Sequence, residues 1–320
     1  MIIQNCILRR NSKNENSMGT PDFSVPALEE LAKVHQVAAV VTQQDRPKGR
    51  GHKMQYTPVK EKALELNIPV YQPEKVKNPE FVDILREINP DVIVVIAFGQ
   101  ILSKEILDLP KYGCINVHAS LLPKYRGAAP IQWAVIDGEE ETGVTTMYMA
   151  EGLDTGDVID TTVIKLDEKE TGGSLFDKLA IEGGKLIVET LSKLENGTAT
   201  RTPQDDEKSS YAGKITKELG QIDFTKPAVT IERLIRGLNP WPSAYTTLDG
   251  KAMKVWDATV EEGNVTEQPG EIVEIAKHYI KVATGENYLK INEIQLAGKK
   301  RMPMDAFLNG YSIKENILGV

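Results

Sequence analysis

Two polar residues in the sequence are placed to act on a carbonyl group. Asn116 and His118 lie two residues apart in an apolar segment, residues 113–118, that predicts a strand, so their side chains share one face. An asparagine amide can donate a hydrogen bond to a developing oxyanion, and a histidine exchanges a proton near neutral pH. A single histidine in such a place is also common as a purely structural residue.

A second polar stretch brings a carboxylate. Gly152 and Gly156 bracket Asp154 and predict a tight loop that carries Asp154 into a site, although an ordinary aspartate turn has the same composition. Beside His118, such a carboxylate would orient the imidazole and stabilise its charged form. Because no nucleophile with a neighbouring base is evident, Asn116, His118 and Asp154 together indicate direct acyl transfer without a covalent intermediate.

Alternating elements must position these residues. Over the first two-thirds of the chain, apolar β-branched segments alternate with segments of helical periodicity, which predicts an α/β domain with a mostly parallel, Rossmann-like sheet. Ligand sites in such sheets lie at the carboxyl ends of the strands. The predicted strands are residues 37–42, 68–73, 91–97 and 113–118, and the predicted helices are residues 57–67, 78–88 and 103–109.

The pattern changes after Asn196. Residues 197–210 are rich in Thr, Asp, Ser and Gly and predict a linker, and Asp249-Gly250 is a hairpin signal among short strands. Several short strands so close together predict a small β-barrel of the OB-like kind. The predicted helix is residues 231–238, and the predicted strands are residues 244–248, 252–258, 270–276, 279–284 and 288–296.

Composition limits the class of protein. The chain has 320 residues, 41% hydrophobic and 26% charged, and its net charge of −8 at first argues against a nucleic-acid partner. Residues 46–60, however, carry basic side chains and no acidic ones, which suits either a phosphate backbone or a solvated loop. Cys6 and Cys114 form neither a disulfide framework nor a metal site, so we expect the cytosol.

Several motifs resemble those of the formyltransferases that use 10-formyltetrahydrofolate. They are Asn116 with HASLLPKYRG at residues 118–127, and GLDTGD at residues 152–157. Further motifs are similar to those of the methionyl-tRNA formyltransferases within that superfamily. They are MGTPDF (18–23), QDRPKGRG (44–51), LNPWPSAYTT (238–247) and AGKKRM (297–302). The resemblance therefore runs from Met18 almost to the end of the chain.

The resemblance implies an activity and its substrates. The formyl group of 10-formyltetrahydrofolate, the co-substrate, would pass to the α-amine of methionyl-initiator tRNA and give N-formylmethionyl-tRNA for translation initiation. The amine would attack directly, through a tetrahedral intermediate. Neither a metal nor a nicotinamide is needed, because the transfer leaves the oxidation level unchanged. We expect a monomer in the cytoplasm, since one chain would suffice for the site.

The resemblance also implies roles for single residues and domains. Residues 1–196 would be the catalytic domain (1–17 atypical), 197–218 the linker, and 219–320 an OB-like tRNA-binding domain. Asn116, His118 and Asp154 would be catalytic. The folate would contact Ser120, Leu121, Leu122, Pro123, Phe98 and Gly99, and the tRNA would contact Arg46, Lys48, Arg50, Lys53 and Lys214, with Arg50 foremost.

The sequence departs from the family pattern in two places. Gln44 stands where the family usually has proline. In the family a short apolar strand runs directly into MGTPDF, whereas here the polar residues 11–17 precede that motif and form a poor strand. Either residues 1–8 supply the first strand through a longer connection, or that strand is missing and the sheet has exposed edges.

Three other functions fit parts of the same pattern. A formyltransferase acting on an amino-sugar nucleotide would carry the same motifs from His118 to Gly127, but the basic residues 46–60 and the segment 238–247 favour tRNA. A formyltetrahydrofolate hydrolase would use water in place of the amine and would not need the basic residues. A tRNA-binding module with an inactive catalytic domain would not need Asn116, His118 and Asp154.

Overall fold

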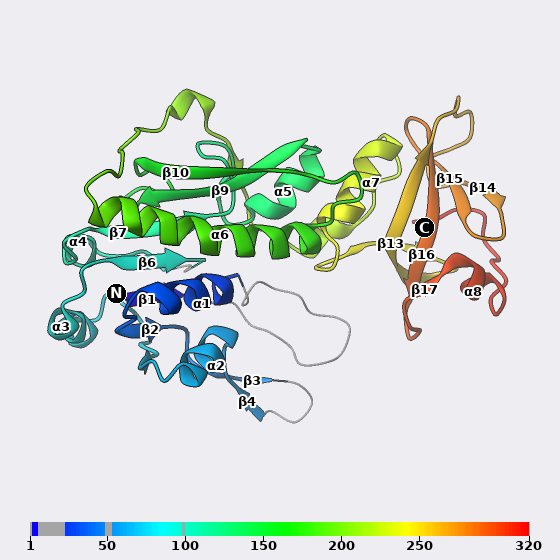
Figure 1. Cartoon of the computed structure of the whole chain (residues 1–320). Helices are drawn as coiled ribbons and strands as arrows, with labels where there is room; N and C mark the ends of the chain where they lie inside the picture. Colours follow the sequence, from blue (N-terminus) through cyan, green and yellow to red (C-terminus); the bar gives the residue numbers. More distant parts are fainter. Residues whose placement is uncertain (1, 6–22, 49–52, 98–99, 320) are drawn as a thin grey trace. The chain divides into compact units, whose positions relative to one another are not determined.

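The protein is described by a computed structural model, which covers residues 2–5, 23–48, 53–97 and 100–319 (Figure 1). The chain forms two compact units that alternate along the sequence. The first unit comprises Met1–Pro130, Glu140–Leu166 and Ser174–Lys214, and the second comprises Ile131–Glu139, Asp167–Gly173 and Ile215–Val320. In the described residues, no helix has the length and apolar character needed to cross a membrane.

The first unit is built on a sheet of seven strands in the order β10-β9-β7-β6-β1-β2-β5. The strands from β7 to β5 run parallel, whereas β9 is antiparallel to β7, and β10 to β9. The predicted α/β class with a mostly parallel sheet is therefore confirmed. The strands are β1 (Ile2–Asn5), β2 (Ala39–Val41), β5 (Val70–Tyr71), β6 (Ile93–Ile96), β7 (Cys114–His118), β9 (Glu141–Tyr148) and β10 (Val158–Lys165).

The position of strand β1 shows whether the N-terminal residues supply the first strand or that strand is missing. It lies between β6 and β2, parallel to both, with Ile3 paired with Val94 on one side and Val40 on the other. The first residues of the chain therefore take the place of the strand that the family runs into MGTPDF. Residues 6–22, which join β1 to α1, lie outside the described residues.

Helices cover the sheet of the first unit. Helix α3 buries Phe81, Val82 and Leu85 in a cluster with β2 and β6, and it ends at the left-handed Asn89, before Pro90. Helix α6 packs on β7 and β9, because a Cβ at Gly183 would lie 3.1 Å from Val117 (Figure 1). The helices of this unit are α1 (Val25–Val34), α2 (Pro58–Glu65), α3 (Pro79–Ile88), α4 (Lys104–Leu107) and, apart from its first two residues, α6 (Gly172–Glu195).

Two small sheets complete the first unit. Strands β3 (Arg46–Lys48) and β4 (Lys53–Gln55) form an antiparallel hairpin, and β8 (Arg126–Gly127) pairs in parallel with β11 (Tyr211–Ala212). The second pairing joins segments that are far apart in the sequence, and one of them belongs to the predicted linker. A short 3-10 helix, η1 (Asp206–Lys208), precedes β11.

The second unit holds an antiparallel sheet in the order β12-β13-β16-β15-β14, with β17 paired to β16. Asp249 and Gly250, both with positive φ, form the predicted hairpin turn between β12 and β13. Within residues 215–319, no strand pairing joins β14 to β12, so the described sheet is open and the OB-like barrel stays a prediction. The strands are β12 (Ala244–Leu248), β13 (Lys251–Glu261), β14 (Ile272–Ile275), β15 (Ile280–Ala283), β16 (Tyr288–Leu296) and β17 (Met302–Pro303).

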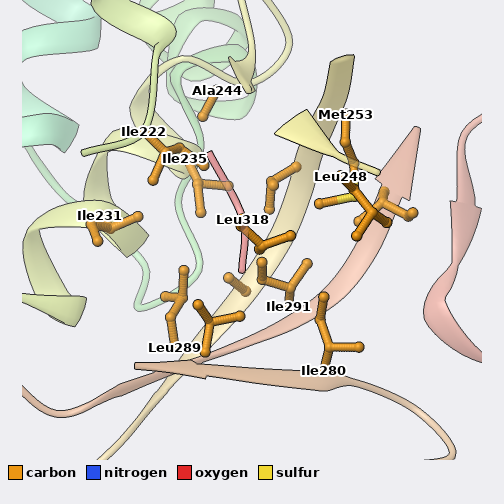
Figure 2. Close-up of a cluster of buried hydrophobic side chains, with 14 of the residues drawn as sticks. Ile222, Ile231, Ile235, Ala244, Leu248, Met253, Ile280, Leu289, Ile291 and Leu318 are labelled. Carbon is orange, nitrogen blue, oxygen red and sulfur yellow. The ribbon is translucent and has the colours of Figure 1, made fainter. Parts of the chain in front are cut away.

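The core of the second unit lies between this sheet and its helices. Figure 2 shows Ile231 and Ile235 of α7 gathered with Ile291 of β16 and with Leu318 near the end of the chain. Burial of these side chains explains why the apolar residues of this unit alternate along its strands. The helices of this unit are α5 (Pro130–Asp137, from Ile131 on), the 3-10 helix η2 (Glu218–Gly220), α7 (Ala228–Gly237) and α8 (Met304–Leu308).

Candidate active site

Asn116 and His118 project from β7 on the face away from α6. Side chains alternate along a strand, and Val117 lies against α6 while Cys114 packs in the cluster that holds α3. Asn116 and His118 share the Cys114 face, as their spacing predicts. Both are buried, with 8% and 6% of their surface exposed, so a partner group there would meet little water.

The His118 ring is oriented by a backbone carbonyl. Its Nε2 lies 2.8 Å from the carbonyl oxygen of Tyr125. A carbonyl can only accept, so Nε2 carries the hydrogen and Nδ1 is left with its lone pair in the neutral ring. Nδ1 faces Asp154, at 3.7 Å from Oδ2. The nitrogen free to take a proton is thus the one beside the carboxylate.

The side chain of Asp154 is held by a hydrogen bond to the backbone of another segment. Its Oδ2 accepts a hydrogen bond of 2.8 Å from the N–H of Gly127. Glycine is needed at both contacts: Gly127 has φ +112°, and a Cβ on Gly156 would lie 1.7 Å from the carbonyl oxygen of Tyr148. The predicted tight loop is confirmed, and the close approach of the Tyr148 backbone explains why residue 156 is a glycine.

The segment predicted as a linker lies against this site. Ser210 accepts a 2.8 Å bond from the N–H of Tyr125 through its Oγ, and a 2.9 Å bond from the N–H of Arg126 through its carbonyl. Gln204 reaches the Asp154 loop from the same segment. No periodic pattern in the sequence predicts either contact, because both depend on chain reversals that bring residues 198–212 back to β8.

The turn at residues 120–123 is held by hydrogen bonds to Thr145 of β9. Thr145 Oγ1 donates to the carbonyl of Ser120 at 2.6 Å and accepts from the N–H of Leu122 at 3.2 Å. The Ser120 hydroxyl is buried and donates to the carbonyl of Lys124, so it holds the turn and is not directed outward. Leu121, Leu122 and Pro123 remain partly exposed around a cis peptide bond between the last two. Phe98 and Gly99 lie outside the described residues.

The basic residues predicted to meet tRNA fall on the β3–β4 hairpin and on the segment before η2. Arg46, Lys48 and Lys53 belong to the hairpin strands, whereas Arg50 lies outside the described residues. Lys214 is exposed.

Lys60 belongs to the same basic run but is engaged within the protein. Its Nζ lies 2.5 Å from Asp45 Oδ2 and 2.7 Å from Gln72 Oε1, and these side chains brace the base of the hairpin. The charge of Lys60 is therefore balanced locally by Asp45.

Among the described residues, no group of three or more His, Cys, Asp or Glu side chains is placed to hold a metal ion. Burial raises the pKa of the Cys114 thiol to about 12, which keeps it protonated. His118 and Asp154 thus lie close together, and Asn116 lies on the same face of β7 as His118; their catalytic roles stay a prediction.

Family models match most of the chain. One described as formyl transferase matches residues 17–191, and one described as formyl transferase, C-terminal domain, matches residues 214–312. Curated relatives that carry the name methionyl-tRNA formyltransferase are similar over almost the whole length. The relative from Agathobacter rectalis is 60% identical over 93% of this chain and 96% of its own, and that from Clostridioides difficile is 54% identical over 94% and 98%.

Solved structures share the fold at lower identity. A sugar 3N-formyl transferase, WlaRD, superposes with a TM-score of 0.63 at 21% identity over 93% of this chain and 98% of its own. HypX from Aquifex aeolicus, solved with tetrahydrofolic acid, gives 0.62 at 18% identity over 96% of this chain and 46% of its own. At these identities the similarity establishes the fold.

Proposed function

This chain belongs to the formyl transferase family and, within it, groups with the methionyl-tRNA formyltransferases; we propose that it transfers the formyl group of 10-formyltetrahydrofolate to the α-amine of methionyl-initiator tRNA. The product is N-formylmethionyl-tRNA, which serves translation initiation. The single observation that carries the proposal to this site is the position of His118, whose Nε2 is held by the Tyr125 carbonyl while Nδ1 faces Asp154.

His118 acts as the proton acceptor in the proposed reaction. A free α-amine has a pKa of about 7.7–8.0 and is largely protonated near pH 7, so the site must bind or produce the neutral amine. As that amine attacks the formyl carbon, a proton passes from its nitrogen to Nδ1 of His118, directly or through water. The Asp154 carboxylate, 3.7 Å away, then faces the positive charge of the imidazolium.

Asn116 stabilises the other charge that develops. The new carbon–nitrogen bond turns the formyl carbon tetrahedral and its oxygen into an oxyanion, to which the Asn116 amide donates, assisted by protonated His118. The oxyanion then re-forms the carbonyl, the bond from the formyl carbon to N10 of the folate breaks, and N10 leaves with the proton that His118 had accepted. The oxidation level is unchanged throughout, so the step balances without an electron acceptor.

The proposed function also assigns residues to folate binding and to tRNA binding. The partly exposed Leu121, Leu122 and Pro123 border the pterin, whereas Ser120 contributes by holding their turn. Arg46, Lys48, Arg50, Lys53 and Lys214 bind tRNA phosphates, which basic side chains contact without reading sequence.

The second unit serves the tRNA as well. We assign it the role that the sequence predicted for residues 219–320, an OB-like fold on nucleic acid. In this proposal residues 1–196 are the catalytic domain and 197–218 the linker, although residues 131–139 and 167–173 pack in the second unit. The protein works as a monomer in the cytoplasm, where its substrates are found.

One assay separates this function from its competitors. Formyl transfer from radiolabelled 10-formyltetrahydrofolate is followed with methionyl-initiator tRNA, with uncharged tRNA and with a dTDP-linked amino sugar as acceptors. Label on the charged tRNA alone supports the proposal. Label on the sugar would show that the protein is a sugar formyltransferase. Formate released without an acceptor would show that it is a hydrolase. Absence of folate binding in the folded protein would leave a tRNA-binding module.

A further inference from the structure

The loop that carries Asp154 needs support from elsewhere in the chain. Asp154 has φ +53°, in the left-handed region that side chains other than glycine seldom occupy. A residue stays in such a conformation only when its surroundings fix it. The hydrogen bond from Gly127 to the carboxylate fixes the side chain, so the backbone of the loop requires a second partner.

Gln204 is that partner. Its Nε2 donates to the carbonyl of Asp154 at 2.8 Å and to the carbonyl of Gly156 at 2.7 Å. Both hydrogens of one side-chain amide are therefore used on carbonyls two residues apart in the same loop. A clamp of this kind holds the backbone of Asp154 and its neighbours in one conformation.

The other end of the Gln204 amide fixes its direction. Its Oε1 accepts a 3.0 Å hydrogen bond from Nε of Arg126. Arginine only donates and carbonyl oxygens only accept, so a reversed amide would place donor against donor and acceptor against acceptor. The position therefore requires an amide in this orientation, and a carboxylate or an apolar side chain cannot replace it.

Arg126 links the clamp to the carboxylate itself. The next residue along the chain is Gly127, whose N–H donates to Asp154 Oδ2, and this oxygen faces His118 Nδ1. Gln204 thus joins the two segments that set the Asp154–His118 distance, the loop and strand β8. We propose that Gln204 is a positioning residue for the formyl transfer proposed above, acting through Asp154 without touching a substrate.

The first test compares Gln204→Ala and the volume-preserving Gln204→Met with the wild type in the formyl-transfer assay. Misplacing a catalytic group by a fraction of an ångström is expected to lower kcat about ten- to a hundredfold. The KM for folate and for charged tRNA should change less than about twofold, because no binding contact is removed. The matched control is Asp206→Asn, which removes a carboxylate 83% exposed at the far side of Arg126 and should leave kcat unchanged.

The second test asks whether the effect passes through Asp154. In an Asp154→Asn background, Gln204→Ala should lower single-turnover transfer far less than in the wild type, because residues that act as one unit are not additive. An equal loss in both backgrounds, or unaltered kcat in both Gln204 variants, would overturn the proposal. So would circular dichroism showing both variants unfolded, which would make Gln204 a residue of the fold. An inactive wild type would instead overturn the proposed function.

Discussion

At the scale of single residues, the direction of one imidazole ring decides which nitrogen can take a proton. The sequence predicts that Asp154 orients His118, and this stays a prediction; the structure adds a second contact, from the carbonyl of Tyr125 to Nε2. Asp154 is left opposite Nδ1, where it meets the charge that protonation creates. The two ring nitrogens therefore face different groups, a backbone carbonyl at Nε2 and a carboxylate at Nδ1.

Asn116→Ala tests the oxyanion contact. Removing one preorganised donor from a buried site is expected to raise the barrier by about 2.7–4 kcal/mol and to lower kcat about 10²–10³-fold. Steady-state formyl transfer measures the effect, and Asn196→Ala, at an exposed asparagine just after α6, is the control and should behave as the wild type. Normal turnover in the Asn116 variant would remove Asn116 from the mechanism.

The thiol of Cys114 gives a prediction that depends on pKa alone. Burial raises this pKa to about 12, so at pH 8 only about one thiol in ten thousand is a thiolate, the form that reacts. A Cys6→Ser variant should therefore resist a maleimide reagent while folded and react fully in denaturant, as mass spectrometry would record. Labelling of the folded variant within minutes would show that Cys114 is accessible, contrary to its 3% exposure.

At the scale of elements, strands β1 and β11 both come from sequence that is weak by local criteria. β1 belongs to a short apolar segment followed by polar residues, yet it occupies the centre of the sheet between β6 and β2. β11 lies in a segment predicted as a linker, yet it pairs with β8 beside Asp154. In both cases the pairing partner supplies hydrogen bonds that local propensity does not predict.

Ile3→Pro tests the placement of β1. Proline lacks the N–H that a central strand donates, and an unpaired buried backbone group costs about 1–3 kcal/mol. In the Ile3→Pro variant, Tm should fall by about 2–4 °C for each kcal/mol of unfolding free energy lost, as expected for a unit of this size. Ile3→Val keeps both the N–H and the β-branched side chain and should unfold like the wild type. Equal Tm values for the proline and valine variants would place β1 outside the sheet.

At the scale of the whole molecule, local charge matters more than total charge. The protein carries a net charge of −8, but strands β3 and β4 hold Arg46, Lys48 and Lys53 and no acidic residue. The Lys60–Asp45 pair balances one of the charges in the basic run 46–60, and the proposed tRNA contacts use the others. Binding of tRNA is therefore compatible with an acidic protein.

Arg50→Ala tests that surface. Loss of one phosphate contact should raise the KM for charged tRNA and reduce the slope of log affinity against log salt by about 1, with the KM for folate unchanged. Kinetics over a range of KCl concentrations provide the measurement. Lys33→Ala, which removes an exposed charge from α1, is the matched control. The same tRNA slope in the Arg50 variant and the wild type would exclude Arg50 from the interface.

The sequence by itself determined the chemistry and most of the elements. The two-residue spacing put Asn116 and His118 on one face of β7, and the paired glycines predicted the Asp154 loop, because these are properties of neighbouring residues. Buried strands such as β6 were predicted for the same reason, since their apolar β-branched residues are adjacent in the chain.

Tertiary structure alone decided what depends on residues far apart in the chain. Residues 2–5 complete the first sheet because they pair with β2 and β6. The strand pairings of the second unit likewise determine that its described sheet is open. The Tyr125 carbonyl that orients His118 depends on a chain reversal, and Gln204 reaches Asp154 across 50 residues. No local pattern encodes such contacts, because the free energy that selects them comes from groups brought together only when the chain folds.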